Sequence, residues 1–355
     1  MKKVAFLVEW LVLLLLLEVA IRQVVPSQVD VPHLRVFAEG FYTWYPGSRF
    51  TYHNLPKVEP PTADVRINEY GLRGPSFARQ KPEGEIRVLV LGDSYTAAVQ
   101  LPEDRIFTTL LALELDRSAP TGRWRVVNAG FNGVGTAHEL LYFLQQGASF
   151  APDVVVLQYA YNDLEDSLAH GGFRLTNAGL ELKEEFRSPA FWRGPLLAIR
   201  DAVANRSLVF YLIYKALSGA GRGPEVGAAH ADTPVATAAP GVRLVRELVA
   251  QLIAASNRIG VPVILLTIPS PLYLSGGDAA YDAVVADFRS LVDGDENQLI
   301  VTDPMFRESE SRGQPVYLAF DGHLSDQGHH LVATALAGAV AQTPRARSTR
   351  APSAP

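Results

Sequence analysis

Three polar side chains stand at the ends of apolar runs, where a folded chain would expose them together. Ser94 follows the run at residues 86–91, and Asn162 follows the run at residues 153–159. His323 comes just before a helix-like segment, with Asp321 two residues ahead of it. A serine becomes a nucleophile when a histidine takes its proton and a carboxylate orients the imidazole. These residue types therefore indicate acyl-transfer chemistry.

Taken singly, each of these residues has a structural explanation. Gly92-Asp93-Ser94 could be a turn in which the serine or the aspartate caps a helix. Asn162 could form an Asx-turn, and His323 could be a loop residue. The elements that carry the residues must therefore show whether they meet.

Five largely apolar segments predict buried strands, because near-continuous apolar runs are typical of strands covered on both faces. They span residues 86–91, 124–128, 153–159, 261–267 and 298–302. Helical patterns separate them, at residues 107–117, 136–146, 242–259 and 281–292, and a last one follows at 327–341. Alternating strands and helices predict a parallel five-stranded sheet in a three-layer α/β/α sandwich. In such sheets the site forms at the carboxyl ends of the strands, where Ser94 and Asn162 are placed.

The segment after the second strand, residues 128–136, contains three glycines. Glycines allow a backbone to approach a ligand closely, or simply to turn sharply from strand to helix. From the residues alone, both explanations stay open.

Together, and in this order, these segments resemble the four sequence blocks of the SGNH/GDSL hydrolase family. The resemblance implies a flavodoxin-like sandwich, with Ser94 as nucleophile, His323 as base and Asp321 as the residue that orients it. It also implies an oxyanion hole made by the backbone amides of Ser94 and Gly133 and the side chain of Asn162. Many members have Asp-x-x-His where this chain has Asp-x-His, a spacing that also occurs in the wider superfamily.

Two further details belong to the resemblance. Gly130 is the less favoured alternative to Gly133 as the oxyanion glycine. The run Asn68-Glu69-Tyr70-Gly71-Leu72-Arg73 is similar to the lead-in of membrane-tethered bacterial members. Overall the resemblance covers residues 65–340.

The first 25 residues predict a membrane anchor. Residues 4–21 are almost all apolar and, as a helix, would span roughly 27 Å, close to the thickness of bilayer hydrocarbon. Glu9 and Glu18 are unfavourable there, although Glu18 can pair with Arg22 one turn on. A buried soluble helix and a cleaved signal peptide are the alternatives, but no small-x-small cleavage site follows the run. Two lysines precede it, so we expect the N-terminus inside and the body outside the cytoplasm.

The predicted hydrolase-like domain spans residues 65–342, and further segments precede it, follow it and interrupt it. Residues 26–64 are expected to form an extended linker, and 343–355 a disordered tail. An insertion at 164–240 is expected over the carboxyl edge of the sheet. Within it, Phe191 and Trp192 could form an apolar wall over Ser94 that binds substrate, or could only pack helices onto the body.

Composition and charge exclude some classes of binding partner. With 32 basic and 37 acidic residues, the net charge of −5 argues against binding nucleic acid through its backbone. The chain has no cysteine, which excludes disulfides and thiolate metal sites. No histidine has carboxylates at metal-binding spacing, so we expect neither metal nor cofactor. The expected partners are the membrane and an acylated small molecule, glycan or lipid, and the oligomeric state is left open.

Three functions share these residues. A serine esterase acting on ester-linked acyl groups, of envelope polysaccharide or lipid, is the leading hypothesis. An O-acyltransferase would use the same triad but pass the acyl group to a sugar hydroxyl rather than to water. A membrane-tethered interaction module could keep the fold without catalysis.

Overall fold

The computed structural model describes residues 2–24, 33–118, 123–177, 179–217, 239–292 and 296–344. Its centre is a five-stranded, wholly parallel sheet in the order β11-β10-β7-β5-β6. The strands are β5 (Glu85–Gly92), β6 (Arg123–Gly130), β7 (Val154–Ala160), β10 (Val263–Ile268) and β11 (Gln298–Val301). Every residue of β5, β7 and β10 is buried, and most of these residues are apolar. The five predicted strands are confirmed.

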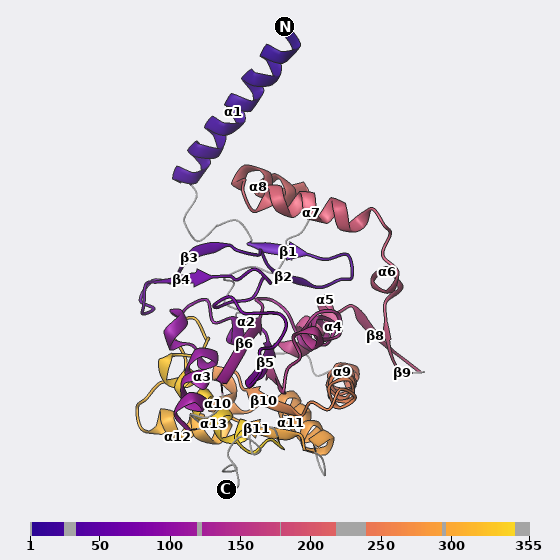
Figure 1. The fold of residues 1–355 in the computed structure, drawn as a ribbon. Coiled ribbons are helices and arrows are strands. Elements are labelled where there is room, and N and C mark those ends of the chain that lie inside the picture. The colour runs from indigo at the N-terminus through magenta and orange to yellow at the C-terminus, as the bar shows by residue number, and fades with distance from the viewer. Residues whose placement is uncertain are drawn as a thin grey trace.

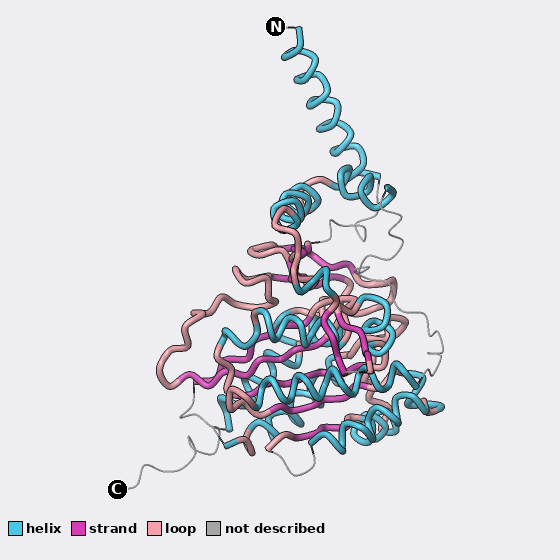
Figure 2. The backbone as a smooth tube through the Cα atoms, turned by 90° about the vertical axis from the view of Figure 1, so that its right-hand side faces the viewer, coloured by secondary structure: helices cyan, strands magenta, loops and turns pink. Residues whose placement is uncertain are grey.

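Helices cover both faces of this sheet (Figures 1 and 2). One face packs against α4 (Thr136–Gln145), α9 (Ala239–Asn257) and α11 (Ala279–Val292), through side chains such as Leu140, Leu248 and Phe288. The other packs against α3 (Phe107–Ser118), α12 (Asp303–Ser311) and α13 (Asp326–Val340), through Leu111, Phe306 and Leu336. Two apolar clusters, one on each side, confirm the predicted three-layer α/β/α sandwich.

Two β-hairpins form where the sequence indicated only an extended linker. β1 (Leu34–Val36) pairs with β2 (Tyr42–Trp44), and β3 (Arg49–His53) pairs with β4 (Thr62–Arg66), both antiparallel. Trp44 is fully buried, and its indole N–H donates to the carbonyl of Gly130 at 3.0 Å, at the carboxyl end of β6. The hairpins therefore lie against the edge of the sheet where a site is expected.

The predicted insertion builds several small elements, which are α5 (Asp163–His170), β8 (Phe173–Thr176), β9 (Gly179–Leu182), α6 (Glu184–Arg187), α7 (Arg193–Ala204) and α8 (Leu208–Leu217). Its helix α7 rests on the first hairpin: the backbone N–H of Val36 donates to Asp201 at 2.6 Å, and Asn205 donates to the carbonyl of Leu34 at 2.8 Å. The hairpin layer thus separates α7 from the sheet (Figure 1). Residues 218–238 of the predicted insertion (164–240) and residues 345–355 of the predicted tail (343–355) lie outside the described residues.

The N-terminal helix α1 (Lys2–Val24) projects away from the body (Figures 1 and 2). Arg22 pairs with Glu18 at 2.7 Å, as the sequence predicts. Within the described part of the chain, none of the helices has the length and apolar character needed to cross a membrane.

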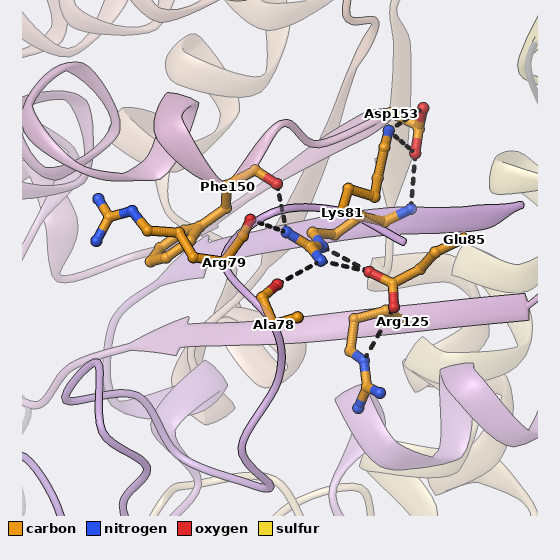
Figure 3. A network of polar contacts seen from close by, with 8 residues as sticks. Ala78, Arg79, Lys81, Glu85, Arg125, Phe150 and Asp153 are labelled. Atoms are coloured by element: carbon orange, nitrogen blue, oxygen red, sulfur yellow. Dashed lines mark hydrogen bonds and ion pairs between the residues drawn. The ribbon is translucent and has the colours of Figure 1, made fainter. Parts of the chain in front are cut away.

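A buried network of charged side chains lies at the amino end of β5, opposite the end where a site is expected (Figure 3). The Arg87 side chain is fully buried and donates to Glu85 and to three backbone carbonyls, those of Ala78, Arg79 and Phe150. Because these carbonyls belong to the segments that flank β5, the network fixes the start of that strand. The candidate site lies at the other, carboxyl end of the same strand.

Candidate active site

Ser94 sits on a sharp turn at the carboxyl end of β5. Gly92 has no room for a side chain, since a Cβ there would lie 2.2 Å from Thr96 Oγ1. Asp93 then caps the short helix α2 (Ser94–Ala97), its Oδ1 accepting from the N–H of Tyr95 at 2.9 Å. The turn leaves Ser94 half-buried at the edge of the sheet while its neighbours are buried.

The loop before α13 carries His323 to this serine. Phe320 and Gly322 both have positive φ, 66° and 82°, which folds the chain back on itself. The N–H of Leu318 donates to the carbonyl of His323 at 2.7 Å, and the hydroxyl of Tyr95 donates to the carbonyl of Gly322 at 2.9 Å. A residue next to the serine therefore holds the histidine loop in place.

Ser94, His323 and Asp321 form a continuous hydrogen-bonded chain. His323 Nε2 lies 2.9 Å from Ser94 Oγ, and its Nδ1 contacts Asp321 Oδ1. The same carboxylate accepts from the backbone N–H of His323 at 3.2 Å. Burial raises the pKa of Asp321, but the bonds to His323 outweigh it and hold that pKa below its usual value. An ionised carboxylate at Nδ1 leaves Nε2 free to accept the serine proton.

Asn162 reaches the same site from the end of β7. Its Nδ2 donates to Asp93 at 3.1 Å and to Asp166 at 2.9 Å. An amide nitrogen has two hydrogens, so both are committed here. For Asn162 to donate to an oxyanion, one of these two bonds must break. The structure brings Asn162 next to the nucleophile turn, and its oxyanion role stays a prediction.

The two candidate glycines have different surroundings. A Cβ on Gly130 would lie 2.2 Å from the backbone nitrogen of Ala97, so this glycine is needed for close packing against α2. Gly133 lies half-buried in the following turn with φ 67°. Only Gly133 therefore has an accessible backbone position, although its oxyanion role also stays a prediction.

A match to a family model decides the classification. Residues 90–331, more than half of the chain and the span that carries the triad, match the GDSL-like Lipase/Acylhydrolase family. The chain belongs to this family. It is a hydrolase that acts on ester bonds.

Several solved structures have a fold similar to that of this GDSL-like hydrolase. No curated protein matches its sequence. They include the acetyl xylan esterase AlAXEase, with 19% identity, a TM-score of 0.44 and coverage of 72% of this chain and 100% of that one. A catalytic mutant of the acetylxylan esterase Axe2 from Geobacillus stearothermophilus has 14% identity, a TM-score of 0.45 and coverage of 74% and 96%. The lipase/acylhydrolase from Enterococcus faecalis has 13% identity, a TM-score of 0.42 and coverage of 72% and 95%.

The hydrolase has one positioning residue whose function the sequence pattern did not reveal. Arg73 is 3% exposed, and its guanidinium donates to the carbonyls of Ala97 at 2.6 Å, Ala98 and Leu101 at 2.5 Å. Burial lowers its pKa to about 10, so it stays charged at neutral pH. Arg73 therefore clamps the far end of α2, the helix that begins with Ser94. In the sequence, only the resemblance of residues 68–73 to the family's lead-in segment pointed to Arg73.

We expect Arg73→Met to destabilise the fold by about 3 kcal/mol, because three buried carbonyls lose their donor. Urea unfolding followed by circular dichroism measures this loss. Arg73→Lys is the matched variant: it keeps the charge but cannot form the fork, so it should recover less than half of the stability. Full stability in Arg73→Met would show that the clamp is unnecessary.

Phe191 and Trp192, the predicted substrate wall, precede α7, the helix that rests on the first hairpin. Phe191 is 93% exposed and Trp192 is 55% exposed, at the start of α7. The structure gives neither residue a contact with Ser94 or His323. Their role in substrate binding stays a prediction.

Two other histidines near the site are structural. His329 is buried and its Nδ1 accepts from the N–H of Phe107 at 3.1 Å, and burial lowers its pKa to about 3. His138 Nε2 lies 3.0 Å from the carbonyl oxygen of Tyr42, and burial of the ring lowers its pKa to about 4. Over the described ranges, His, Asp and Glu side chains form no group of three placed to hold a metal ion.

A buried aspartate beside the nucleophile should make stability depend on pH. Burial raises the pKa of Asp93 from 3.8 to about 6, so the folded state holds this proton more tightly than the unfolded state. Its contribution is complete below pH 4 and is lost as pH rises through 6, by up to about 3 kcal/mol. Asp93→Asn should remove that part of the pH dependence. Urea unfolding of both proteins at pH 4 to 7 tests it, and parallel curves would contradict it.

Proposed function

We propose that the chain is a serine esterase in which Ser94 is acylated by its substrate. One observation carries the proposal, the 2.9 Å contact between Ser94 Oγ and His323 Nε2 with Asp321 on the other ring nitrogen. Ser94 Oγ attacks the ester carbonyl carbon while Nε2 takes its proton. The imidazolium then gives that proton to the leaving alcohol.

The second half of the reaction uses the same groups. His323 takes a proton from a water molecule, the resulting hydroxide attacks the acyl-serine carbonyl, and the proton returns to Ser94 Oγ as the acid leaves. In both halves the negative oxygen would be stabilised by the amides of Ser94 and Gly133 and, after one of its bonds is released, by Asn162. Each such donor contributes on the order of 3 kcal/mol to catalysis.

We also propose that α1 anchors the enzyme in a membrane, with the body outside the cytoplasm. In support, the six consecutive residues Val12 to Leu17 of α1 are all 44% exposed or more, so its apolar side chains face outward around the whole helix. An apolar helical segment that is exposed on every side and not covered by protein suits lipid. Such a position favours acyl groups on envelope polysaccharide or lipid as substrates.

The proposal is tested on the full chain, purified in mild detergent. Release of p-nitrophenol from p-nitrophenyl acetate is expected, with an acyl-enzyme that adds one acetyl mass to the peptide containing Ser94. The assay is repeated with acetylated glycan, with and without a non-acetylated acceptor. Acetate in solution supports the esterase, whereas acetyl groups on the acceptor identify an O-acyltransferase. Absence of turnover on every ester would indicate an interaction module.

A further inference from the structure

Helix α7 exposes an apolar stripe on the face that points away from the body. Trp192, Leu196, Ile199 and Val203 follow one another at spacings of four, three and four residues, which places them on one side of a helix. They are 55%, 57%, 63% and 40% exposed. Asp201 and Ala204, on the other side, are buried. A contiguous exposed stripe of this kind marks an interaction surface.

A half-buried carboxylate of α1 holds the start of α8, the helix that follows α7. Glu18 of α1 accepts hydrogen bonds from Ser207 Oγ at 2.9 Å and from the backbone N–H groups of Leu208 and Val209 at 2.8 and 3.0 Å. These N–H groups begin α8, so Glu18 caps that helix from another part of the chain. Arg22 adds a bond to the carbonyl of Arg206 at 3.2 Å. α1 and the α7–α8 pair are therefore joined where α1 meets the body (Figure 1).

The charged residues around the stripe indicate which kind of surface it would bind. Residues 187–217 contain five basic residues but a single acidic one, in a chain whose net charge is −5. One of the five, Arg187, pairs with Glu184 just before this segment. The acidic residue, Asp201, is buried against β1 and bonds to Arg200. Exposed apolar side chains flanked by arginines are typical of helices that lie in the interface of a bilayer with anionic headgroups.

We propose that α7 lies along the surface of an anionic membrane, with Trp192, Leu196, Ile199 and Val203 inserted among the headgroups. This inference rests on the proposed anchor, because α1 brings α7 to the bilayer. The first hairpin connects α7 to the carboxyl edge of the sheet, through Trp44 and Gly130. Docking would thus hold the Ser94 side of the body toward the membrane, where esters of lipids or of surface glycans are found.

The absence of cysteine makes a site-specific test simple, since one introduced cysteine is the only thiol. The full chain carries Ile199→Cys, labelled with the environment-sensitive dye NBD, in vesicles of phosphatidylethanolamine and phosphatidylglycerol. The matched control is Leu113→Cys on α3, which is 44% exposed. We expect a blue shift and at least a twofold gain in emission at position 199, weaker in phosphatidylcholine vesicles, and neither change at 113.

Flotation of the same vesicles separates this inference from the anchor. Protein that floats with an unshifted label at 199 would overturn the docking of α7 while leaving the anchor intact. Protein that does not float would overturn both. A shift that grows with protein density and ignores phosphatidylglycerol would assign the stripe to a second copy of the chain, which also overturns the proposal.

A second variant tests the stripe itself. Adding Leu196→Glu to the labelled Ile199→Cys protein should return the label to an aqueous emission, while α1 still holds the protein in the vesicles. Turnover of a water-soluble ester should be unchanged, which shows that the variant is folded. A label that stays shifted would mean that the apolar stripe does not mediate the contact.

Discussion

Replacing Ser94 with alanine is expected to lower kcat/KM for an aryl ester by at least about 10³-fold, and His323→Ala should do the same. Ser94 Oγ is the atom that forms the bond to the acyl group, and His323 is the group that takes its proton across 2.9 Å. The double variant should be little worse than either single one. Members of a triad act as a unit, so the second loss removes nothing that the first left in place.

Steady-state kinetics on the full chain gives these losses, and mass spectrometry shows whether the acyl-enzyme still forms. Ser290→Ala is the matched control, since Ser290 is exposed on α11 and bonds only to the carbonyl of Asp287 among its described contacts. Circular dichroism checks that each variant is folded. Turnover within tenfold of the unmodified enzyme in Ser94→Ala would contradict a serine mechanism.

The central sheet could be predicted because its strands are covered on both faces. A run such as Val154–Ala160, buried at every residue, must be apolar throughout, and this pattern differs from the helical period of α9 or α13. The sheet in turn predicted that Ser94 and Asn162 would meet at one edge. The strands could not predict that His323 lies close to Ser94, because a loop carries His323. The family resemblance supplied that step, and the structure places His323 against Ser94.

The hairpin layer could not be predicted because its strands are only three to five residues long. Such segments are too short to show a period, and their stability comes from distant contacts such as that of Trp44 with Gly130. The missed function of Arg73 has the same origin. Its three acceptors lie 24 to 28 residues away, and local sequence does not indicate which carbonyls will lack donors.

Glu18 shows how a distant contact changes the meaning of a residue. In the sequence it is a charge that disfavours an apolar helix, relieved only by Arg22. In the structure it also caps α8, about 190 residues away along the chain. The same carboxylate that argued against the anchor therefore joins α1 to α8. No property of residues 4–21 alone could have predicted this.

Asp321→Asn is expected to lower kcat by about 10² to 10⁴-fold with KM nearly unchanged. An asparagine can occupy the same place, but its amide can turn an N–H toward Nδ1, which leaves the proton on Nε2 and removes the acceptor for the serine proton. It also removes the negative charge that stabilises the imidazolium, which forms only after Ser94 loses its proton. An interaction made only in the transition state affects kcat, not KM.

The same experiment answers the question raised by the short Asp-x-His spacing. Asp326→Asn, the same chemical change five residues on, is the matched control, because Asp326 is exposed and pairs with Arg105 at the surface. Its kcat should stay within twofold of the unmodified enzyme. If Asp321→Asn also kept its kcat, another group would have to orient His323. Asp321 contacts both Nδ1 and the backbone N–H of His323, so the two-residue spacing is long enough for one carboxylate to fix the ring and its loop together.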